Sequence, residues 1–250
     1  MKRLFRFPIY PWLPLGAGFL GLLLRIWLFA TGLDGRNLLS VTHPAHILSL
    51  VLTVAAMVLL FCFPPNPACV IRKNPPASGI GLLGQMLAGV GILAASFGEL
   101  FSSQDLAVTI TSVLGILAAL SLMSLCWKQT QRNKSRTFEM VAITVYLMAH
   151  LISQYRQWSA EPQLQNYLFQ VLGSVFLMVA CYHRTCLELL GGKLRWYVFF
   201  NQGALLLCIY SLNTRLWLFY LAMGLWSLFD FITIIQSVRL RPARPREEKP

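Results

Sequence analysis

The chain contains few charged residues, and acidic residues are the scarcest among them. Of its 250 residues, 12% are charged and 9 are Asp or Glu, while 56% are hydrophobic. A soluble globular domain averages about 25% charged residues. With so little charge and a mean hydropathy of +0.61, the chain lacks the polar groups that a water-exposed surface needs. We therefore expect lipid to be the solvent for most of its surface.

The motifs of familiar catalytic centres are also missing. There is no GxSxG nucleophile elbow, no HExxH zinc motif and no phosphate-binding P-loop. The apolar stretches do not hold two carboxylates at a spacing suited to acid–base chemistry. The sequence therefore predicts that the protein is not an enzyme and needs no cofactor.

Metal sites and disulfides are not indicated either. The six cysteines include no CxxC pair, and none lies in a connection that we expect outside the cell, so no disulfide framework is implied. His43 and His46 are three residues apart and could supply two metal ligands, but no third ligand is evident. We interpret these histidines as part of a helix entry and predict no metal site.

Apolar stretches long enough to cross a bilayer recur eight times along the chain. A transmembrane helix needs about 20 such residues. The stretches are 13–32, 45–63, 79–98, 106–126, 138–156, 166–183, 195–212 and 216–237. They leave no room for a soluble domain, only for a basic cytoplasmic tail at 239–250. The predicted fold class is all-α: a polytopic integral membrane protein with a bundle of about eight transmembrane helices.

Lys and Arg residues concentrate in alternate connections between these stretches. One set of connections and the two termini hold Lys2, Arg3, Arg6, Arg72, Lys73, Lys128, Arg132, Lys134, Arg136, Arg184, Lys193, Arg195, Arg239, Arg241, Arg244, Arg246 and Lys249. The other connections hold Arg36, Arg156 and Arg215. Because cytoplasmic loops are rich in Lys and Arg, this alternation predicts eight spans with both termini in the cytoplasm.

This topology also sets the expected location and partners. Residues 33–44, 99–105, 157–165 and 213–215 should lie outside, and the protein should reside in a cytoplasmic (inner) membrane. The basic side should face a lipid bilayer with anionic headgroups. No nucleic acid is expected as a partner, because the basic residues are spread over several connections and do not form one patch.

One face of the stretch 138–156 is polar. Spacings of three, four and seven residues place side chains on one face of a helix. The residues so related are Glu139, Tyr146, His150, Ser153, Gln154 and Gln157. An unpartnered polar group in hydrocarbon costs several kcal/mol, so this face must contact protein or water. Glu139 begins the helix and is expected to pair with a nearby basic residue.

Arg25 lies inside the first stretch and cannot be neutralised by deprotonation. It shares a helix face with Gly18, Gly21 and Gly32, and small residues mark the face where membrane helices approach closely. Arg25 should therefore point into the bundle. Glu99 is its predicted structural partner, reached directly or through water. If Glu99 is too distant, an anionic solute becomes the better explanation for this arginine.

Asp230 is the acidic counterpart near the other end of the bundle. It shares a face with Ser227, and Asn201 and Gln202 lie at a similar depth in the preceding stretch. If only such amides and hydroxyls surround Asp230, its carboxyl group could bind and release a proton, as carriers require. The alternative is an ionised carboxylate held by a cation.

Two functions remain open from the sequence. The first is a carrier or permeation protein for a small, anionic solute, with a polar path between spans 1, 5, 6 and 8. The candidate path residues are Arg25, Tyr146, His150, Gln154, Gln170 and Asp230. The second is a non-transporting sensor or accessory subunit whose polar groups only specify helix packing. A water-accessible cavity would favour the first, and dry packing the second.

Overall fold

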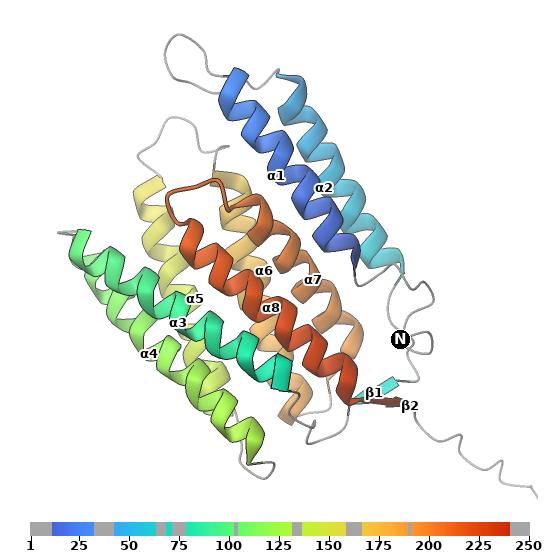
Figure 1. The fold of residues 1–250 in the computed structure, drawn as a ribbon, viewed down its shortest axis with the longest axis vertical. Helices are drawn as coiled ribbons and strands as arrows, with labels where there is room; N and C mark the ends of the chain where they lie inside the picture. Colours follow the sequence, from blue (N-terminus) through green and yellow to red (C-terminus); the bar gives the residue numbers. More distant parts are fainter. Residues whose placement is uncertain are drawn as a thin grey trace, which may run out of the picture.

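The computed structural model describes residues 12–32, 43–63, 69–71, 79–102, 105–131, 137–158, 167–189 and 192–240. In this part of the chain it contains eight α-helices and one pair of short β-strands (Figure 1). The elements are α1 (Leu13–Thr31), α2 (Pro44–Cys62), β1 (Cys69–Ile71), α3 (Gly79–Ser102), α4 (Leu106–Thr130), α5 (Thr137–Trp158), α6 (Leu168–Leu189), α7 (Leu194–Tyr210), α8 (Trp217–Ser237) and β2 (Val238–Leu240).

Each helix coincides with one predicted apolar stretch, so the all-α membrane fold class is confirmed. Five helices, α1 to α4 and α8, are long and apolar enough to cross a membrane. The other three helices do not meet these criteria of length and hydropathy, and the reasons are physical. α7 has 17 residues, and α5 and α6 carry more polar side chains along their length. These three helices nevertheless pack against the rest of the bundle.

Six of the helices form a closed ring. Starting from α3, each helix packs on the next through α8, and α8 returns to α3. α1 packs on α7, and α2 packs mainly on α1 (Figure 1). All six ring helices contribute to one apolar core, which includes Ile92, Leu122, Met140, Leu177, Cys208 and Trp226. The ring therefore has a packed centre.

The bundle has two ends (Figure 1). The hairpin end holds the C-termini of α1, α3 and α5 and the short α7–α8 connection, residues 211–216. The strand end holds the C-termini of α4, α6 and α8 together with β1 and β2, which pair antiparallel with Val70 opposite Arg239. The strands were not predicted, because three residues are too few to show an alternating pattern. β2 includes the start of the predicted tail, whose residues 241–250 lie outside the described residues.

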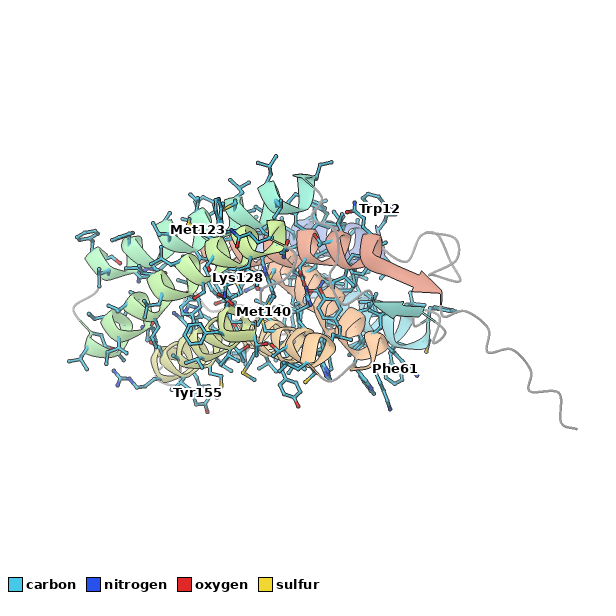
Figure 2. The ribbon with its side chains drawn as sticks, turned by 90° about the horizontal axis from the view of Figure 1, so that it is seen from below. Trp12, Phe61, Met123, Lys128, Met140 and Tyr155 are labelled. Carbon is cyan, nitrogen blue, oxygen red and sulfur yellow. The ribbon has the colours of Figure 1, made fainter. Side chains whose placement is uncertain are left out.

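The outward faces of the helices are apolar. Leu23, Leu83 and Ile152 leave 62%, 73% and 66% of their surfaces exposed. Such faces are suited to lipid contact. Figure 2 shows Phe61 and Tyr155 pointing away from the bundle, whereas Lys128 lies between α4 and α5.

Ion pairs join α4 to α5 at both ends. At the strand end the ammonium of Lys128 contacts Oε1 of Glu139 at 2.5 Å. The prediction that Glu139 pairs with a basic residue is therefore confirmed. At the hairpin end, Nη2 of Arg156 donates to both carboxylate oxygens of Asp105, at 2.9 and 2.8 Å. Asp105 also caps α4 by accepting from the backbone N–H of Ala107 at 3.2 Å.

The Asp105 contacts predict a pH-dependent stability. The hydrogen bond from Ala107, together with that from Arg156, lowers the pKa of the Asp105 carboxyl below its usual value. A lowered folded-state pKa stabilises the protein above the unfolded pKa of about 3.9, and this contribution is lost as the pH falls through the folded-state value. Asp105→Asn should therefore lower the melting temperature slightly at pH 7, with the difference from wild type shrinking below about pH 3.9 in melting curves. A difference that grows on acidification would contradict this.

α1 contacts α7 through its glycine face, as predicted. A Cβ atom added to Gly21 would lie 1.8 Å from Cζ of Tyr210, and one added to Gly18 would lie 2.9 Å from Cδ1 of Ile209. A side chain at Gly21 would therefore force the two helices apart. Arg25, one turn further along this face, is buried in the bundle, so its predicted inward orientation is confirmed.

Candidate functional site

A polar cavity of about 470 Å³ opens at the hairpin end of the bundle. Its walls come from α1, α3, α4, α5, α6 and the connection between α7 and α8. Four of its lining residues are buried: the apolar Val108 and the polar Arg25, Gln154 and Gln170. The three polar ones are 5%, 6% and 4% exposed and form its floor. Exposed lining residues such as Arg215 and Gln157 lie at its rim. Three of the six predicted path residues thus line one cavity.

The guanidinium of Arg25 lies between two aromatic rings. Its Cζ is 5.7 Å from the ring centre of Phe29 on α1 and 5.5 Å from that of Phe169 on α6. Contacts of this kind attract a cation to the ring faces. Arg25 thus packs on one aromatic side chain of its own helix and one of α6 at the cavity floor.

The predicted partner of Arg25 lines the same cavity but does not contact it directly. Glu99 comes from α3, and within the described part of the chain no ion pair joins it to Arg25. The charge of Glu99 interacts with Arg215 at the rim. A water-mediated Arg25–Glu99 pair remains a prediction, while the direct pair is not formed in this structure.

Tyr146 and His150 lie in α5 on the core side of Gln154 and do not line the cavity. Both are buried and pack against Phe219 of α8, with ring centroids 6.1 and 4.2 Å away. Nε2 of His150 has no hydrogen-bond partner among the described residues. These three rings form an aromatic layer between the cavity floor and the strand-end half of the bundle.

Asp230 belongs to a different cluster, in the strand-end half. Nε of Arg184 on α6 lies 3.2 Å from Oδ2 of Asp230. The hydroxyl of Tyr197 on α7 also donates to Oδ2, and Nε2 of Gln85 on α3 donates to Oδ1 at 3.4 Å. The carboxylate therefore joins four helices and is held by a cation.

This arrangement matches the second of the two alternatives that the sequence left open, a carboxylate held by a cation. The sixth predicted stretch ends at residue 183 and leaves Arg184 in a cytoplasmic loop, whereas α6 continues to Leu189. Arg184 is buried, with 2% of its side chain exposed. Inside the bundle, Asp230 supplies the counter-charge that the buried Arg184 needs.

A second polar contact next to this cluster also joins helices. Nδ2 of Asn201 on α7 donates to the backbone oxygen of Ser227 on α8 at 2.9 Å, and the Ser227 hydroxyl donates to Oδ1 of Asn201 at 2.9 Å. Interhelical bonds of this kind stabilise membrane bundles. The Asn201–Ser227 contact and the Arg184–Asp230 cluster thus join helices in the strand-end half, while Arg25, Gln154 and Gln170 line a cavity at the hairpin end.

Comparisons with known protein families, curated proteins and solved structures found no match to this chain. Among the described residues, no three His, Cys, Asp or Glu side chains are grouped so that they could hold a metal ion. The class of protein is defined by the fold and the cavity: it is a helical membrane protein with a polar cavity at one end of its bundle.

Proposed function

We propose that the protein is a carrier for a small anionic solute and that the cavity at the hairpin end binds this solute. All eight helices would span a cytoplasmic membrane, with both termini in the cytoplasm and the hairpin end outside. The alternating distribution of Lys and Arg supports this orientation, since the connections at the strand end carry most of them.

The observation that carries the proposal is the charge of the cavity. Among its described lining residues, Arg25 and Arg215 are positive and Glu99 is negative. The amide side chains of Gln154 and Gln170 add hydrogen-bond donors beside Arg25 on the floor. A guanidinium binds a carboxylate or phosphate through two parallel hydrogen bonds, so this floor is suited to a small anion.

The packing of the rest of the bundle supports one conformational state of a carrier, in which the site is closed on the strand-end side. The aromatic layer of Tyr146, His150 and Phe219 and the Arg184–Asp230 cluster lie between the cavity and the strand end. In alternating access, a central site opens to one side at a time while packed helices close the other. The cavity would represent the outward-open state.

A sensor or accessory subunit is the second candidate, and the dry packing of Tyr146, His150 and Asp230 favours it. These three predicted path residues contact protein groups and do not extend the cavity toward the strand end. A protein of this class would bind the solute in the same cavity and would not release it on the other side.

Solute uptake separates the two candidates. The full-length protein would be reconstituted in liposomes, and entry of radiolabelled aspartate, succinate and phosphate would be measured with the same unlabelled solute inside. We expect exchange of at least one of these anions well above protein-free liposomes. Binding without exchange would favour the sensor, and absence of both would refute an anion-binding cavity.

A further inference from the structure

We infer that the solute is an amphoteric acid, with a carboxylate for Arg25 and an ammonium group for Glu99. This inference rests on the proposed function and specifies its substrate class. It begins from two opposite charges that line one cavity without forming an ion pair with each other. A ligand that carries both charges can contact both residues at once.

The two charges reach the cavity from different walls. Arg25 belongs to α1, which packs on α7, whereas Glu99 belongs to α3, which packs on α4 and α8. Both side chains line the cavity, so a zwitterionic ligand in it can contact the α1 wall and the α3 wall together.

The Arg25 side is built to hold a carboxylate in one orientation. Phe29 and Phe169 flank the guanidinium, and the amides of Gln154 and Gln170 share the floor with it. Below the floor, the Tyr220 hydroxyl donates to the backbone oxygen of Gln170 at 3.5 Å, which supports this turn of α6. A planar carboxylate matches the planar donor edge of a guanidinium better than a single point charge does.

The third charge narrows the substrate class further. Arg215 lies at the exposed rim and interacts electrostatically with Glu99. The described lining charges are thus positive at the floor, negative on the α3 wall and positive at the rim. The complementary ligand has a carboxylate, an ammonium and a second carboxylate, which is the charge pattern of an acidic amino acid.

A dicarboxylate without the ammonium is the matched comparison. Succinate has the two carboxylates and the carbon chain of aspartate but no ammonium group. In this cavity it would leave the carboxylate of Glu99 without a cationic partner on the ligand and near two ligand carboxylates. Like charges that lie close together repel, so the Glu99 carboxylate disfavours a ligand that brings only carboxylates. Aspartate should therefore bind more tightly than succinate.

The test is equilibrium binding of radiolabelled aspartate and succinate to the purified full-length protein in lipid nanodiscs. We expect wild type to bind aspartate at least about 10-fold more tightly than succinate, as one charged hydrogen bond is worth at least that factor. Glu99→Gln should weaken aspartate binding by about 10- to 100-fold and leave succinate binding unchanged or stronger. Asp105→Asn, which removes a carboxylate that does not line the cavity, is the control and should alter neither.

The outcomes of this test separate the inference from the proposed function. Equal affinities for aspartate and succinate, both unaffected by Glu99→Gln, would overturn the amphoteric substrate and leave an anion carrier. Failure of aspartate, succinate and phosphate alike to bind a folded wild-type protein would overturn the proposed function itself. If Glu99→Gln does not fold, Glu99→Asp keeps the charge, and it should weaken aspartate binding while leaving succinate binding unchanged.

Discussion

Asp230→Asn is expected to lower the free energy of unfolding by about 3–5 kcal/mol, because breaking a buried ion pair leaves one charge uncompensated. The side chains of Arg184 and Asp230 are 2% and 0% exposed, so neither can regain water when the other is removed. The Tyr197 hydroxyl and the Gln85 amide would also lose a charged acceptor. Chemical unfolding of the purified protein, followed by tryptophan fluorescence, measures this effect.

Two further variants identify the cause of that loss. Asp105→Asn removes a carboxylate from an exposed ion pair and should have a much smaller effect at neutral pH. The double variant Arg184→Met with Asp230→Leu removes both charges and should be more stable than Asp230→Asn alone, because no uncompensated charge remains. Wild-type stability of Asp230→Asn would contradict a structural ion pair and return Asp230 to the candidates for proton binding.

The sequence predicted the orientation of Asp230 but not its partner. Helical spacing placed Asp230 on an inward face, which is confirmed, since its surface is 0% exposed. Counting Lys and Arg by connection treated Arg184 as a loop residue, because the rule assumes that such charges avoid the bilayer. An arginine that lies next to an inward carboxylate breaks this assumption. One acidic and one basic residue at matching depths on different helices were the signal for the pair.

Helix number and approximate ends could be predicted, because both follow from local composition. The length of an apolar run must match the bilayer, and Gly, Pro and charged residues interrupt it. The helix face that carries Arg25 could also be predicted, because Gly18 and Gly21 repeat at helical spacing and α7 packs directly on them. These are properties of a single segment.

The cavity could not be predicted, because it depends on which helices become neighbours. The polar face of α5 is continuous in sequence, yet its residues have different surroundings at different depths in the bundle. Gln154 lines the cavity, His150 packs on Phe219, and Glu139 pairs with Lys128. Helical spacing shows which side chains share a face of one helix. It does not show which side chains of other helices lie opposite that face. The closure of the ring by α3 and α8, far apart in sequence, likewise leaves no local pattern.

Equilibrium binding of aspartate to the Arg25 variants is the most direct test of an anion site at Arg25. Arg25→Gln should weaken binding by about 100-fold, because a charged, two-point hydrogen bond to the carboxylate is lost. Arg25→Lys should recover only part of the affinity, since an ammonium keeps the charge but not the planar pair of donors.

Arg195→Gln provides the matched control for this measurement. Arg195 lies at the strand end over the ring of Phe61, 5.0 Å from its centre, and does not line the cavity. Its replacement removes the same charge from the protein and should leave binding unchanged. We expect a loss of affinity confined to the Arg25 variants. Wild-type affinity in a folded Arg25→Gln protein, or an equal loss in Arg195→Gln, would contradict an anion site at Arg25.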